Sequence, residues 1–288
     1  MWNRGAAARA RQAVVRAVLG VSLVAVVAGC GTSAPDGGVL ARAVAAVPAD
    51  VAADGLLVQR GAAGDALLVD QLGLAVDDVD VTARTPAPSL RVVLGDVAGV
   101  ADRLADVGFA PVASPDGWQV LHRTGGVTGF AGVPVVAVGG DRVVVGGDAQ
   151  VRRVIGGGEG LGVPPEVLAA VDIALLHPAL GSPPAPVVEA ADLPPVDVAA
   201  LTAVEEEGTG QVVLVTGEEV TQAEAVAAAV RVRTAGPLGE DGAPLLEAGG
   251  SLARGEVITV DVTWRGDPRE LLGAALGGGL LDFLDRPG

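Results

Sequence analysis

Length, composition and charge narrow the classes of function open to this chain of 288 residues. Half of the residues are hydrophobic, which is enough for one large domain or two small ones with packed cores. The formal net charge of −16 repels phosphate backbones and anionic lipid surfaces, so it excludes nucleic-acid binding and a purely electrostatic attachment to a membrane.

The first 29 residues have the pattern of a secretory signal peptide. Residues 1–16 carry four arginines and no acid, and residues 17–29 are almost wholly apolar. A membrane-spanning helix needs about 20 apolar residues, and this run is too short. We therefore predict that residues 1–29 are removed.

The only cysteine of the chain follows this segment directly. Val27, Ala28, Gly29 and Cys30 resemble the lipobox of bacterial lipoproteins, in which the thiol receives a diacylglyceryl group and cleavage makes the cysteine the N-terminus. The resemblance implies that Cys30 is a lipid attachment site and that the protein is anchored on the extracytoplasmic face of the cell membrane. An ordinary signal peptide followed by a buried free cysteine is the open alternative, and an intrachain disulfide is excluded because no second thiol exists.

The mature chain is strongly acidic and begins with a tether. Loss of residues 1–29 removes four arginines and no acids, leaving 15 Arg against 35 Asp and Glu, a formal charge of −20. Residues 30–38 are predicted to form the flexible tether. Residues 39–47 have the apolar spacing of a helix that ends before Pro48, and we expect it to pack on a core rather than lie in the membrane.

A first α+β unit is predicted for residues 39–178. Its core elements begin with a buried strand at 91–94. The later elements are a helix capped by Asp96 and ending at Gly108, strands starting at 118, 133 and 142, and a short helix capped by Asp148 and stopped by Gly156.

A Pro-rich connection at 179–195 separates this unit from a second α+β unit at 196–288. Thr221 and Glu224 form a capping box, and Asp267 with Pro268 opens the last helix. The other expected elements are strands at 172–177, 195–204, 211–214, 245–248 and 256–264. The connection is a domain boundary or a surface crossing over one core, and both alternatives stay open.

The two units share an order of strand, helix, several strands, helix, at an offset of about 120 residues. We predict an α+β fold with antiparallel sheets. The shared order indicates either a duplication or a match that any α+β chain would give.

Few residues suggest chemistry. His122 and His177 stand outside any metal or catalytic motif, and no GxSxG elbow is present. The glycine-rich stretch 156–162 follows a helix and the chain has no lysine, so a helix end explains it better than a phosphate loop. The acids at 77, 78 and 80 lack the spacing of a calcium loop, and those at 205–207 are typical of an exposed turn that aids solubility.

The overall layout resembles that of uncharacterised actinobacterial cell-envelope lipoproteins, and the absence of lysine and tyrosine is typical of a GC-rich genome. The resemblance transfers no catalytic residue. We expect a non-enzymatic interaction module that needs no cofactor and contacts an envelope protein. A carrier of a lipid or other apolar ligand is the alternative, which predicts a cavity of several hundred Å³, and a cell-wall hydrolase is a third class.

Overall fold

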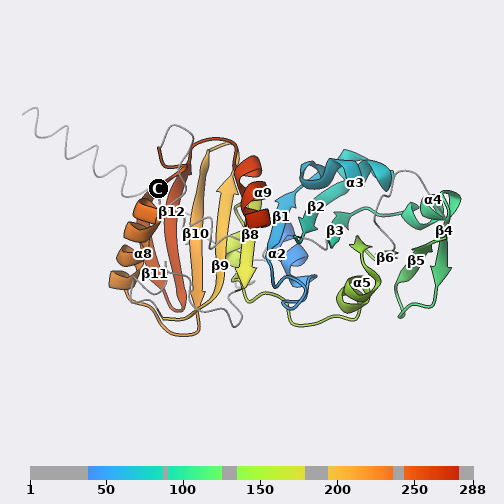
Figure 1. The fold of residues 1–288 in the computed structure, drawn as a ribbon, viewed down its shortest axis with the longest axis horizontal. Helices are drawn as coiled ribbons and strands as arrows, with labels where there is room; N and C mark the ends of the chain where they lie inside the picture. Colours follow the sequence, from blue (N-terminus) through green and yellow to red (C-terminus); the bar gives the residue numbers. More distant parts are fainter. Residues whose placement is uncertain (1–37, 87–89, 125–134, 179–193, 236–242, 279–288) are drawn as a thin grey trace, which may run out of the picture. The chain divides into compact units, whose positions relative to one another are not determined.

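The chain forms a twelve-stranded antiparallel sheet with helices on both faces (Figure 1). The computed structural model describes residues 38–86, 90–124, 135–178, 194–235 and 243–278. The predicted signal peptide, Cys30, nearly all of the tether and most of the Pro-rich connection lie outside these residues. The predicted α+β class with antiparallel strands is confirmed.

The strands in chain order are β1 (Leu56–Arg60), β2 (Val79–Arg84), β3 (Arg91–Gly95), β4 (Phe109–Val112), β5 (Gln119–Arg123), β6 (Val135–Gly139), β7 (Arg142–Gly146), β8 (Ile173–Pro178), β9 (Val196–Val204), β10 (Thr209–Thr216), β11 (Leu246–Arg254) and β12 (Val257–Trp264). The helices are α2 (Gly38–Ala45), α3 (Ala66–Gln71), α4 (Val100–Asp106), α5 (Asp148–Ile155), α6 (Pro165–Leu168), α8 (Gln222–Ala235) and α9 (Pro268–Gly278), with 3₁₀ turns η1 (Ala62–Asp65) and η2 (Val76–Asp78).

The strand order is β11-β12-β10-β9-β8-β1-β2-β3-β7-β6-β5-β4. β1 pairs with β8 near the middle of the sheet. From β1 the chain runs through neighbouring strands to β3, passes through α4 to the edge strand β4, and returns to pair β7 with β3. From β8 it likewise runs to β10, passes through α8 to the other edge strand β11, and returns to pair β12 with β10.

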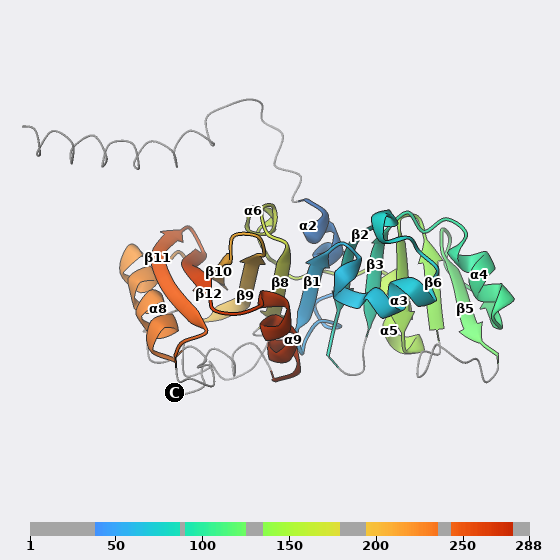
Figure 2. The ribbon, with the colours of Figure 1, turned by 90° about the horizontal axis from the view of Figure 1, so that it is seen from above.

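Valine and leucine runs form the central strands because helices cover them on both faces, so consecutive side chains are buried. One core cluster joins α2, α5 and α6 to one face of the sheet. On the opposite face, α8 and α9 pack on the second cluster and α3 and α4 on the third. Figure 2 shows α2 and α6 on one side of the sheet and α9 on the other.

Helix starts test the capping predictions directly. The box of Thr221 and Glu224 is confirmed, because each side chain accepts a hydrogen bond from the other residue's N–H. Asp267 also caps α9 as predicted, accepting from the Arg269 N–H at 2.8 Å. Two predicted caps are wrong. Gly99 caps α4 with a positive φ of 73°, and Gly147 precedes α5, whose first helical residue is Asp148.

Three strands were not predicted, namely β1, β2 and β4, together with the helices α3 and α6. β11 is also longer than the predicted strand at 245–248, because it continues past a register shift between Ala248 and Ser251. β8 and β9, which flank the Pro-rich connection, pair directly in the sheet. The division into units at 39–178 and 196–288 stays a prediction. Among the described residues, no helix is long and apolar enough to cross a membrane.

Candidate functional site

An open groove of about 620 Å³ lies where β8 and β10 end and β9 begins. We call it the acidic groove. One part of its described lining consists of residues 49–50, which follow α2, and of Arg153 in α5 with residues 159–162 beyond that helix. The other part comes from the sheet: Pro178 ends β8, Asp197 and Val198 begin β9, Val215 and Thr216 end β10, and Glu256 lies in the turn between β11 and β12.

The apolar part of the acidic groove is continuous with the protein core. Leu161, Val198 and Val215 line it and belong to the core cluster under α2 and α5. These side chains are 7%, 5% and 9% exposed, so most of each is held by packing. A firm apolar wall of this kind is what the apolar part of a small ligand needs.

The rim of the acidic groove carries four exposed carboxylates, those of Asp50, Glu159, Asp197 and Glu256. Arg153 is the one cation of the described lining, and its Nε lies 2.8 Å from Asp50 Oδ2. The hydrogen bond from Arg153 lowers the pKa of Asp50 below its ordinary value. No described side chain forms an ion pair with the other three carboxylates, so the rim has a net negative charge.

Backbone contacts hold the glycine-rich side of the acidic groove in place. The Ala49 N–H donates to Glu159 O at 2.9 Å, and Pro48 forms a β-bridge with Gly160. Arg153 Nη1 donates to Gly157 O at 2.6 Å. The stretch 156–162 does end helix α5, as predicted, and it also forms one wall of the acidic groove.

The opposite wall is fixed through Thr216, whose side chain is buried. Its backbone N–H donates to Glu256 O at 2.8 Å, and its Oγ1 lies 2.7 Å from Glu218 O and 3.0 Å from Glu256 O. Thr216 therefore ties the end of β10 to the turn that carries Glu256. Both walls are formed by hydrogen-bonded backbone, which indicates that the acidic groove exists without a ligand.

The two histidines do not share a site. They stand on β5 and β8, which have five strands between them, so six strand spacings separate them, a distance of roughly 29 Å. His122 Nε2 lies 3.1 Å from Asp148 Oδ1, and Arg152 Nε contacts both oxygens of the same carboxylate at 3.0 Å. Within the described parts of the chain, no cluster of three His, Cys, Asp or Glu side chains is arranged to hold a metal.

Other acids singled out in the sequence have structural roles. Asp77 and Asp78 lie in η2, whereas Asp80 lies in β2 and pairs with Arg42 at 3.3 Å. The prediction that residues 205–207 serve only solubility is wrong for Glu205. Its side chain pairs with Arg269 of α9, and its N–H donates to Asp172 Oδ2 at 3.1 Å.

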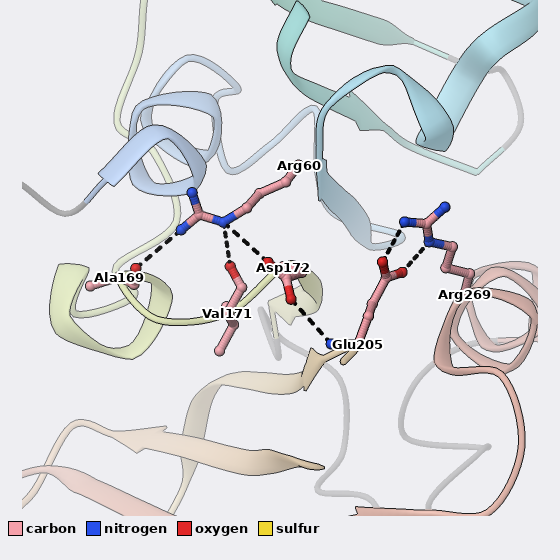
Figure 3. Close-up of polar contacts among 6 residues, drawn as sticks. All are labelled: Arg60, Ala169, Val171, Asp172, Glu205 and Arg269. Carbon is pink, nitrogen blue, oxygen red and sulfur yellow. Dashed lines mark hydrogen bonds and ion pairs between the residues drawn. The ribbon is translucent and has the colours of Figure 1, made fainter. Parts of the chain in front are cut away.

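Figure 3 shows that Glu205 belongs to a network around the start of β8. Arg60, at the end of β1, donates to the backbone oxygens of Val171 at 2.9 Å and Ala169 at 3.1 Å, and its Nε lies 3.5 Å from Asp172 Oδ1. These contacts join the end of β1 to the residues just before β8, and those residues through Glu205, just after β9, to α9, so we read the network as structural.

Sequence reasoning missed the residues of the acidic groove. Asp50, Asp197 and Glu256 are more than 50 residues apart in the chain, and none stands in a motif. The glycine-rich stretch was the only local signal, and its glycines are equally typical of a helix end.

No family model and no curated protein matches this chain. Among solved structures, crystal form I of TP0453 is similar over 80% of this chain and 98% of that one, with 11% identity and a TM-score of 0.41. Crystal form III of TP0453 gives a TM-score of 0.40 with 11% identity, over 80% of this chain and 97% of that one.

Proposed function

We propose that the protein is a non-enzymatic binding protein, anchored through acylated Cys30 on the extracytoplasmic face of the membrane, whose acidic groove holds a small ligand with an apolar part. The observation that carries the ligand site is the groove itself. Its volume of about 620 Å³ lies in the range of small-molecule sites, roughly 300–1,000 Å³. The lipobox motif and the signal segment support the location.

The sequence favoured an interaction module, whereas we now propose the alternative, a carrier of an apolar ligand. A carrier needs a cavity of several hundred Å³ with an apolar wall, and the acidic groove has both properties. The carboxylates of its rim are exposed, and the described lining holds no nucleophile beside a base. We therefore propose that the groove binds a ligand rather than catalyses a reaction, and we propose no cofactor.

Gly162→Trp tests the ligand site. Gly162 lines the acidic groove, and a Cβ built there meets no atom within 4 Å, so we expect the indole to occupy the groove without disturbing the fold. Native mass spectrometry of protein extracted from its own membranes should show a reproducible bound mass in the wild type that the variant lacks. The exposed Ala105→Trp in α4 is the control.

Two results would overturn the site. The first is wild-type protein that carries no bound mass, because the groove would then hold no ligand in the cell. A bound mass that Gly162→Trp retains as well as Ala105→Trp does would place the ligand elsewhere on the protein.

An interaction module remains the second candidate, and the exposed face of β11 and β12 favours it. Helix α8 covers the face of β12 that carries Val260 and Val262. On the other face, Glu247 opposes Thr263, and Leu252, 56% exposed, opposes Thr259. A photo-crosslinking amino acid at Leu252 should capture a defined envelope protein in intact cells, whereas crosslinking only to abundant bystanders would count against this candidate.

We also propose that the two halves of the sheet are duplicated units. The matching chain paths that start at β1 and β8 support this proposal. So does the antiparallel β1–β8 pair, in which Leu57 opposes Leu175 and Val58 opposes Ala174, as a twofold axis between two copies requires. Profiles built from related sequences should align the two halves at the offset of about 120 residues, and a failure to align them would leave the match to chance.

A further inference from the structure

We propose that the acidic groove selects amphiphiles with a positively charged head group over neutral or anionic ones. This inference rests on the function proposed above and adds the chemical class of the ligand. It starts from the distribution of charge around the groove, because the apolar wall by itself accepts any hydrocarbon.

The first step is the balance of charge on the rim. Glu159, Asp197 and Glu256 have no cationic partner among the described side chains, and they come from both walls. A cation between those walls faces carboxylates on either side. The apolar part of the same ligand then contacts Leu161, Val198 and Val215. The groove thus offers an amphiphile one apolar wall and one charged rim.

The second step excludes anionic head groups. A phosphate or carboxylate on the ligand needs a guanidinium, an ammonium or free N–H groups. The one guanidinium of the described lining, Arg153, already donates to Asp50 and to Gly157 O. The chain contains no lysine, and its net charge of −16 repels anions at longer range. An anionic lipid would therefore bring a negative charge to a negative rim whose one described guanidinium is already engaged.

The third step concerns strength. The four rim carboxylates are exposed, so each contributes only modestly to holding a cation, and the contribution falls as salt rises. Selectivity must come from several carboxylates acting together. Removing two of them should weaken a cationic ligand about fivefold and leave a neutral ligand unchanged.

The experiment uses three probes with the same ten-carbon tail, decyltrimethylammonium, decyl maltoside and decyl sulfate. Binding is measured by isothermal titration calorimetry below the micellar concentration of each probe, with circular dichroism to confirm that the protein stays folded. The expected order of affinity is cationic, then neutral, then anionic. The affinity for the cationic probe should fall about fivefold in Asp197→Asn/Glu256→Gln.

The matched control is Glu206→Gln/Glu207→Gln, which removes the same amount of charge from the exposed turn between β9 and β10. If that variant weakens the cationic probe as much as the groove variant does, the preference is a property of the whole acidic surface and the inference is overturned. It is also overturned if the neutral or the anionic probe binds as tightly as the cationic one.

Gly162→Trp separates this inference from the proposed function. One outcome is that the neutral probe binds wild-type protein as tightly as the cationic one does and that Gly162→Trp abolishes this binding. This combination would mean that the groove is a ligand site without charge selectivity. If Gly162→Trp leaves the binding of all three probes unchanged, the ligand site itself is wrong.

Discussion

At the scale of single residues, Gly210 shows a constraint that no sequence pattern reveals. A Cβ built at Gly210 would lie 1.9 Å from Thr202 O and 2.7 Å from the indole nitrogen of Trp264. The Trp264 indole N–H donates to that same carbonyl oxygen at 3.3 Å, and its ring is buried. The need for a glycine beside Trp264 depends on a neighbouring strand, so no local pattern in the sequence could predict it.

Asp148 gives a prediction about pH at the same scale. The hydrogen bond from Arg152 lowers the pKa of Asp148, with a further contribution from His122. A carboxyl with a lowered folded-state pKa stabilises the fold above the unfolded value of 3.8 and loses that effect as the pH falls through the folded value. Urea unfolding should therefore show Asp148→Asn as less stable than wild type at neutral pH, with the two converging in acid. Asp116→Asn in the exposed turn before β5 is the control, and a difference that stays constant with pH would contradict this account.

At the scale of elements, local signals predicted the caps of α8 and α9 and most of the strands, but they missed β1, β2 and β4. The capping box of α8 and the Asp267 cap of α9 depend on residues within one turn, so the sequence contains the whole interaction. Strand β4 has only four residues, one of them Pro111, and β1 ends in the polar pair Gln59 and Arg60. β1 pairs with the distant β8, in which Leu176 opposes Leu56, whereas β4 pairs only with the nearby β5 and was missed because it is short and contains a proline.

The long edge strand β11 leads to a second prediction. Gln222 of α8 donates to Ser251 O at 2.9 Å and accepts from the Ala253 N–H at 3.2 Å, which occupies two backbone groups as a neighbouring strand would. Exposed edges with free backbone groups pair with other chains. We therefore expect Gln222→Ala to shift sedimentation velocity profiles towards larger, concentration-dependent species than wild type gives. Val226→Ala, on the exposed side of the same helix, should leave the profile unchanged. Identical profiles for wild type and both variants would show that Gln222 does not protect the edge strand.

At the scale of the whole molecule, the fold class followed from the order of elements, but the acidic groove did not. The sheet brings the ends of β8, β9 and β10 beside residues 49–50 and 159–162. A site made of segments that lie far apart in the sequence has no local spacing for a sequence pattern to detect. The negative charge of the chain disfavours anionic partners wherever the site lies.

The last prediction concerns the anchor. Two acyl chains hold a protein stably at a membrane, because each buried methylene contributes about 0.8 kcal/mol. The predicted mature chain, at a formal charge of −20, would be repelled by anionic lipids, so its charge would not replace the proposed acyl chains. We therefore expect Cys30→Ser to move the protein from the membrane pellet to the soluble extracytoplasmic fraction of its own cells and to abolish the acylated mass at the N-terminus. Ser33→Ala, three residues further along the predicted tether, should leave both the location and the mass increment in place. If Cys30→Ser stays in the pellet as completely as wild type does, attachment does not depend on the thiol, and the hydrophobic segment before it or a membrane partner must hold the protein instead.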